Sequence, residues 1–248
     1  MSGHSKWSTI KRKKGALDAQ RGKIFTKIAR EIMVAAKEGG GDPSGNPRLR
    51  TALAAARAAN MPRENQERAI KKGTGDLAGV TFETLQYEGR GPAGSCFILE
   101  ILTDNKNRTV AEIRTAFGKS GGEMVSSGAV SWMFMHRGVL EVAKAKISEE
   151  ALMERALEFG GEDVQDWDET WAVLCEPSSF NELQNGLADL EPVGEISYIP
   201  KPESELTLTG DAAISVAKLW AKLDEHDDVQ KCYLNASLPD EVLEEYGP

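Results

Sequence analysis

The sequence contains little of what membrane, secreted or disulfide-stabilised proteins require. No apolar run approaches the roughly 18 residues of a membrane-spanning helix, and the N-terminus lacks the apolar stretch of a secretion signal. The three cysteines, Cys96, Cys175 and Cys232, lie far apart and are odd in number. They indicate neither a disulfide framework nor a thiolate metal site, so we expect buried, reduced thiols. These absences predict a cytoplasmic protein without a membrane partner.

Signals of catalysis and cofactor binding are also scarce. The three histidines are isolated, without a second histidine four residues away or a nearby cysteine to complete a metal site. The segment Gly118-Lys119-Ser120 resembles the end of a phosphate-binding loop, but Ile113 stands where that loop requires glycine. Acidic pairs such as Asp227-Asp228 are typical of solvated surfaces. We therefore expect no enzyme, and no catalytic residue, metal, cofactor or small-molecule substrate.

Charge is distributed very unevenly along the chain. The formal net charge is −9 over 248 residues, but residues 1–79 contain 17 Lys and Arg against 7 Asp and Glu, and residues 80–248 contain 13 against 32. The front of the chain is basic and the remainder is acidic. A phosphate polymer is attracted to the first segment and repelled by the second, which also orients its approach. This asymmetry predicts that the N-terminal segment binds nucleic acid.

The basic segment begins with a stretch that has few apolar residues to bury, in which Trp7 lies among cations. We expect a mobile arm that follows a phosphate backbone while Trp7 stacks on an exposed base. The alternative is a solvated terminus. The arm and the helices behind it supply the predicted nucleic-acid-binding residues, which are Lys6, Trp7, Lys11, Arg12, Lys13, Lys14, Arg21, Lys23, Lys27, Arg30, Arg50 and Arg57.

The longest predicted helix spans residues 18–38, where apolar residues recur with the helical period before Gly39-Gly40-Gly41 ends the run. At 100° per residue, Lys23, Lys27 and Arg30 fall together on the side opposite the apolar face. We expect all three cations to face solvent, where they would suit phosphates.

Two shorter helices are predicted to complete a small helical bundle. One begins after Asn46, with Pro47 at its first position, and carries Arg50 and Arg57. The other runs from about residue 62 to residue 73 and ends in a cluster of cations. Those cations also complement the helix dipole, so a purely structural role is an equal alternative.

After residue 79 the pattern alternates between strands and helices. Within residues 136–204 the order is βαββαβ, which is that of a ferredoxin-like unit. A predicted helix over 211–225 and a strand over 229–234 would complete the sheet that begins before this unit. We expect an α+β protein with an N-terminal helical bundle followed by two ferredoxin-like α+β domains, the third inserted in the second. The predicted domains are residues 1–79, residues 80–135 plus 205–238, and residues 136–204.

The polar loop Thr103–Thr109 joins a predicted strand to a predicted helix. Backbone amides at the start of that helix, assisted by Arg108, would suit an anion. Asp and Asn are more common at such positions as helix caps and turn formers, so we favour a capping role.

Several motifs, taken together, resemble those of the YebC family over nearly the whole chain. They are Gly3-His4-Ser5-Lys6-Trp7 with Ile10-Lys11, Arg21-Gly22-Lys23-Ile24-Phe25, Gly39-Gly40-Gly41-Asp42-Pro43, Tyr87-Glu88-Gly89 with Gly91-Pro92, and Thr103-Asp104-Asn105 with Asn107-Arg108-Thr109. The resemblance implies a helical domain followed by two α+β domains, the last inserted in the middle one. Many relatives have tyrosine inside the Y-E-G-x-G-P turn, whereas this chain has Arg90, which adds a cation there.

The resemblance also implies a function. Members of the family are described as transcriptional regulators that bind DNA, its mitochondrial branch is a translational activator, and bacterial members are also placed on the ribosome. We therefore expect a DNA-binding transcriptional regulator. One alternative is a ribosome-associated translation factor that binds ribosomal RNA and sediments with ribosomes in a salt-sensitive way. The other is a non-catalytic protein-interaction scaffold, which would keep its partners without the arm.

The charge asymmetry yields a direct test of the arm. Replacing Lys11, Arg12, Lys13 and Lys14 with alanine should weaken nucleic-acid binding, because each phosphate contact releases condensed counterions. The slope of log affinity against log salt should flatten by about 0.7–0.9 for each phosphate that the arm no longer neutralises. Binding titrations at several salt concentrations measure both quantities, and unchanged affinity would refute the role of the arm.

Overall fold

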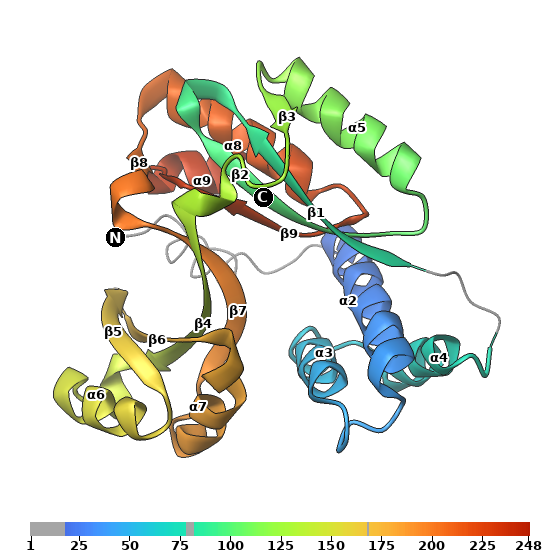
Figure 1. Ribbon diagram of the computed structural model, residues 1–248, viewed down its shortest axis with the longest axis vertical. Coiled ribbons are helices and arrows are strands. Elements are labelled where there is room, and N and C mark those ends of the chain that lie inside the picture. Colours follow the sequence, from blue (N-terminus) through green and yellow to red (C-terminus); the bar gives the residue numbers. More distant parts are fainter. Residues whose placement is uncertain (1–17, 78–81, 168) are drawn as a thin grey trace.

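The computed structural model describes residues 18–77, 82–167 and 169–248, without the side chains of residues 18–21. It is an α+β protein in which a three-helix region precedes two four-stranded antiparallel sheets with helices (Figure 1). In this view the helical region and the second sheet both lie below the first sheet. The first helix reaches up from the helical region to one end of that sheet.

Helix α2 (Asp18–Gly39) is the centre of the helical region, and α3 (Pro47–Ala58) and α4 (Arg63–Thr74) both pack against it. Its residues Ile32, Ala35 and Ala36 are buried in the shared core. The helix ends where Gly40 adopts a φ of +83°, a conformation that only glycine takes without strain. The three helices expected from the sequence are confirmed, including Pro47 in the first turn of α3.

Asn46 joins the end of α2 to the start of α3. Its Oδ1 accepts a hydrogen bond from the Leu49 amide at 3.0 Å, and its Nδ2 donates to the carbonyls of Ala35 at 2.7 Å and Gly40 at 2.9 Å. The residue is only 4% exposed. One side chain therefore caps α3 and also binds a carbonyl within α2 and one just beyond its end, which ties the two helices together.

The first sheet has the strand order β3-β1-β2-β9, and all its pairs are antiparallel. Its strands are β1 (Glu83–Arg90), β2 (Cys96–Thr103), β3 (Glu123–Val125) and β9 (Val229–Leu234), and its helices are α5 (Lys106–Lys119) and α8 (Gly210–Asp224). Strand β9 comes last of these four in the chain, yet it pairs with β2 and not with β3. The chain therefore leaves this sheet after β3 and returns to it after the second sheet is complete.

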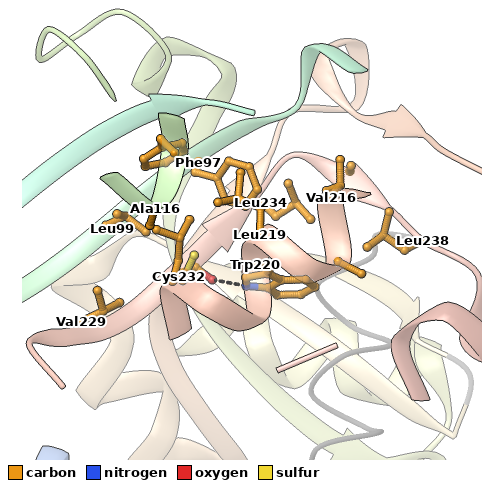
Figure 2. Packing of buried hydrophobic residues seen from close by; sticks show 14 of the residues in the cluster. Phe97, Leu99, Ala116, Val216, Leu219, Trp220, Val229, Cys232, Leu234 and Leu238 are labelled. Atoms are coloured by element: carbon orange, nitrogen blue, oxygen red, sulfur yellow. Dashed lines mark hydrogen bonds between the residues drawn. The ribbon is translucent and has the colours of Figure 1, made fainter. Parts of the chain in front are cut away.

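Strand β2 is buried on both faces, which explains why its sequence is almost continuously apolar. On one face Phe97 and Leu99 pack with α5 and α8, and the Trp220 indole donates to the Cys232 carbonyl at 3.1 Å (Figure 2). On the other face Ile98 packs with Tyr233 in a separate cluster.

The second sheet has the order β5-β6-β4-β7, again entirely antiparallel. Its strands are β4 (Phe134–Ala143), β5 (Gly161–Trp167), β6 (Thr170–Cys175) and β7 (Val193–Pro200), and its helices are α6 (Glu149–Glu158) and α7 (Phe180–Gly186). Leu140, Leu152 and Leu183, from β4, α6 and α7, meet in its core. Helices and sheet therefore enclose a core that is separate from that of the first sheet.

Several short elements were not expected from the sequence. They are β3, the parallel pair β8 (Leu206–Thr207) and β10 (Ala236–Ser237), and the terminal helix α9 (Asp240–Tyr246). Strands of two or three residues are too short to display alternation, so only tertiary pairing defines them. The second helix of the βαββαβ unit is short, because 3-10 turns at 177–179 and 188–190 flank the seven residues of Phe180–Gly186.

The cysteines behave as expected from their spacing. All three are buried and form no disulfide, and burial raises the pKa of Cys175 to about 11, so that this thiol stays protonated at neutral pH. Within the described ranges, no helix is long and apolar enough to cross a membrane. Those ranges also contain no group of three or more His, Cys, Asp and Glu that could hold a metal ion.

The geometry around Asn46 predicts a stability effect. Asn46→Ala removes a helix cap and the side-chain donor to the carbonyls of Ala35 and Gly40, so the free energy of unfolding should fall by about 1–3 kcal/mol. Asn107→Ala is the matched control, because Asn107 is an exposed asparagine in α5, and its effect should stay within about 0.5 kcal/mol. Urea denaturation of both variants measures the difference, and equal stability would contradict the role assigned to Asn46.

Candidate nucleic-acid interface

The predicted nucleic-acid-binding residues fall into three sets in the structure. Lys6, Trp7 and residues 11–14 lie outside the described residues, and so does the side chain of Arg21. The other predicted residues lie on α2 and α3, namely Lys23, Lys27, Arg30, Arg50 and Arg57. These five do not share one surface, because two of them contact the first sheet domain and three are exposed.

Lys27 and Arg30 do not face open solvent, and the expectation that they do is wrong. The Lys27 ammonium donates to the Asp224 carbonyl at 2.6 Å, and the Arg30 guanidinium pairs with Asp228 Oδ1 at 2.9 Å. Arg30 also donates to the Asp227 carbonyl. These acceptors lie at the end of α8 and in the turn before β9, so the middle of α2 docks on the first sheet through ionic contacts.

Asp228 is the centre of this docking contact, although its sequence suggested a solvated acidic pair. Its side chain is 2% exposed. Besides Arg30, its carboxylate accepts hydrogen bonds from Arg108 at 2.7 Å, from Thr109 at 2.7 Å and from Thr103 at 3.1 Å. The carboxylate thus joins the turn before β9, the start of α5 and the helix α2. The interpretation of Asp227-Asp228 as a solvated pair is therefore wrong for Asp228.

The electrostatics of this cluster favour the ionised carboxylate. Burial alone would raise the pKa of Asp228, but hydrogen bonds from Arg108 and Thr109 and the positive charges of Arg108 and Arg30 outweigh burial, so the pKa is lowered. Asp228 therefore remains negative at neutral pH and holds both arginines. This buried carboxylate is satisfied because both of its oxygens accept hydrogen bonds from arginine or threonine donors.

The loop Thr103–Thr109 contributes to this cluster. Asn105 caps α5 by accepting a hydrogen bond from the Arg108 amide at 3.1 Å, which confirms the favoured capping role. The Arg108 guanidinium points to Asp104 and Asp228 of the protein itself. No local pattern could have indicated the second partner, since Asp228 lies 120 residues further along the chain.

The outer face of α3 carries exposed cations. Arg50 and Arg57 are seven residues apart, which places them on the same side of the helix, at the border between its exposed side and the buried residues Leu49, Leu53 and Ala56. Arg57 forms no ion pair with any described residue, and Arg50 donates only to loop carbonyls at 3.1 and 3.4 Å. Both guanidinium groups are therefore available to an anionic partner.

Further exposed cations lie on the neighbouring helices. Lys23 and Lys37 are on α2, and Lys71 and Lys72 are in the last turn of α4. Across the described ranges, none of these four lysines pairs with a carboxylate. Other cations are engaged locally, since Arg48 binds Glu31 and Glu38. The helical region therefore presents a basic outer surface, while its inner side is neutralised by Asp224 and Asp228.

Fold and surface together define an α+β protein in which a basic three-helix region is docked on acidic sheet domains. The chain belongs to the TACO1/YebC family. The model of the TACO1/YebC protein N-terminal domain matches residues 5–76, and the model of the TACO1/YebC second and third domain matches residues 82–236. The resemblance seen in the sequence motifs is thereby confirmed.

Relatives match almost end to end. A protein of Desulfosudis oleivorans is 51% identical over 247 residues, which are 98% of this chain and 100% of the relative. A protein of Desulforapulum autotrophicum is 49% identical over 247 residues, 98% of this chain and 99% of the relative. Both are named probable transcriptional regulatory proteins. The crystal structure of a conserved hypothetical protein from Aquifex aeolicus has 44% identity and a TM-score of 0.79, covering 91% of this chain and 94% of that chain.

The docking contact predicts a measurable loss of stability. Asp228→Asn removes the charge that holds Arg30 and Arg108, and should lower the free energy of unfolding by about 3 kcal/mol. This is the lower end of the range for breaking a buried pair, because Arg108 is 43% exposed and stays hydrated. Asp227→Asn is the matched control and should change stability by less than about 0.5 kcal/mol, since only its backbone carbonyl binds Arg30.

The loss of stability caused by Asp228→Asn should also depend on pH. Because the folded-state pKa of Asp228 lies below the unfolded value of about 3.9, its contribution is complete above about pH 4 and disappears as pH falls through the folded-state pKa. The stability difference between the native chain and Asp228→Asn should therefore shrink on acidification. Chemical denaturation across this pH range measures it, and a constant difference would argue against an ionised Asp228.

Proposed function

We propose that this protein is a DNA-binding transcriptional regulator whose helical region makes the contact. The single observation that carries the proposal is the exposed basic surface of α3, where Arg50 and Arg57 lie two turns apart on one side of the helix without a carboxylate partner among the described residues. Guanidinium groups bind phosphate oxygens in a bidentate manner, so two on one helix face suit successive phosphates. The name shared by the relatives supports the same function.

The proposed DNA interface contains fewer residues than the sequence predicted. Lys23, Arg50 and Arg57 remain in it, and the residues of the predicted arm extend it. Lys27 and Arg30 are assigned to docking, since their charges are neutralised by Asp224 and Asp228. The acidic sheet domains repel a polyanion, so DNA approaches the outer side of the helical region.

We also propose the finer domain organisation expected from the sequence. The order β5-β6-β4-β7 with two helices is that of a ferredoxin-like unit, which supports residues 136–204 as a domain. The first sheet differs from that order, because its chain begins with the hairpin β1-β2 before α5 and its strands are arranged β3-β1-β2-β9. The pairing of β9 with β2 supports a second domain formed by residues 80–135 plus 205–238. A cytoplasmic location fits this function.

The proposal is tested by a pair of double variants with equal charge change. Arg50→Gln combined with Arg57→Gln should weaken binding to a duplex DNA and flatten the salt slope by about 0.9 for each phosphate that is no longer neutralised. Arg90→Gln combined with Arg114→Gln is the control, because both arginines are exposed but lie in the acidic part of the chain. Fluorescence anisotropy over a range of salt concentrations distinguishes the two variants.

The result that would overturn the proposal is equal binding by both double variants, or no binding of DNA by the native chain. Crosslinking in cells followed by sequencing then identifies the natural target. Recovery of promoter DNA is expected. Recovery of ribosomal RNA alone would replace the DNA proposal with a translation factor, and recovery of no nucleic acid would favour a protein-interaction scaffold.

A further inference from the structure

A small pocket opens on the helical region between α2 and α4. It has a volume of about 240 Å³. Three segments line it. They supply Phe25, Thr26, Ala29 and Met33 from α2, Met61 from the turn before α4, and Asn65, Arg68, Ala69 and Lys72 from α4. Neither the docking contact nor the basic face of α3 uses this space.

The floor of the pocket is apolar and suits a flat ring. Phe25, Ala29 and Met33 are spaced by four residues, so they form one row along α2, and the buried Ala69 faces them from α4. Ala29 and Ala69 are small, which leaves room between the aromatic ring and the thioether. Aromatic side chains stack with the face of any nucleobase, and methionine sulfur also packs favourably against rings.

The rim of the pocket is cationic and polar. Asn65, Arg68 and Lys72 lie at three- and four-residue intervals and therefore form one stripe on α4. Arg68 pairs with Glu64, but the two side chains are 56% and 80% exposed, so the pair is weak and exchangeable. Neither Lys72 nor the amide of Asn65 has a side-chain partner among the described residues. An amide is the group that hydrogen-bonds the edge of a base.

We infer that this pocket binds one unstacked nucleobase of a single-stranded DNA segment, while Arg68 and Lys72 hold its flanking phosphates. The inference rests on the proposed function and adds a base-binding site to it. Charge complementarity selects this occupant, because an apolar side chain of a partner protein would fill the floor but leave both cations and the amide unused. The flat face of a nucleobase matches the apolar floor of the pocket, and its polar edge matches the amide of Asn65. The anionic backbone of the strand matches the cations Arg68 and Lys72 at the rim.

Thr26 and Thr51 offer a matched pair of variants. Both threonines are exposed, and both hydroxyls donate to the carbonyl four residues earlier, at 3.0 Å in α2 and 3.1 Å in α3. Only Thr26 lines the pocket. Thr26→Phe therefore fills the pocket mouth, whereas Thr51→Phe adds the same ring at an equivalent helical position elsewhere.

The experiment compares two single strands of equal length, one with thymine bases and one in which every base is replaced by an abasic sugar. The native full-length chain should bind the base-containing strand about 5-fold to 150-fold more tightly. Thr26→Phe should remove most of this preference without weakening binding to the abasic strand, and Thr51→Phe should preserve it. If Thr26→Phe keeps the full preference, or weakens both strands equally, the base-binding proposal is overturned.

A second variant keeps the test decisive if Thr26→Phe does not fold, which circular dichroism establishes. Asn65→Ala removes one neutral hydrogen bond to the base and should reduce the preference about 2-fold to 12-fold, with Asn107→Ala as its control. An unchanged preference overturns the proposal.

Failure of the proposed function gives a different result, because the native chain would then bind neither duplex DNA nor single strands. Binding of both strands without a base preference would overturn only the pocket.

Discussion

The placement of the helical region on the first sheet depends on one buried carboxylate. Asp228 lies in the turn before the last strand of the first sheet, and it collects a guanidinium from the helical region, another from the start of α5, and two threonine hydroxyls. A buried charge is tolerated only when its donors are all in place. The position of α2 on the sheet is therefore coupled to the capped start of α5 through a single side chain.

This contact divides the cations of the helical region by function. Those that meet Asp224 and Asp228 are neutralised and hold the region in place, while Arg50 and Arg57 on α3 and the lysines in the last turn of α4 stay exposed. A basic segment is thus not uniformly a binding surface. The proposed DNA contact occupies the outer face, and the proposed base pocket lies between α2 and α4 on the same region.

The acidic sheet domains complement this division. They supply the carboxylates that anchor α2, and in the proposed function their net negative charge keeps DNA at the outer side. The acidic composition of the sheet domains therefore both holds α2 in place and repels a polyanion. A change in the orientation of the helical region would alter which of its cations a nucleic acid contacts. The family to which the chain belongs, and the regulatory names of its relatives, agree with such an arrangement.

Local sequence determined most of the secondary structure, because helical and alternating periods, Asn46, Pro47 and the glycines act within a few residues of each other. It also determined the segregation of charge, which is a property of composition. It did not determine which cations are free: Lys27 and Arg30 have the same pattern as Lys23, yet their partners lie 197 or 198 residues away. Pairing with Asp228, the two- and three-residue strands and the pocket beside Phe25 arise only when distant segments pack, since tertiary contact alone brings those atoms together.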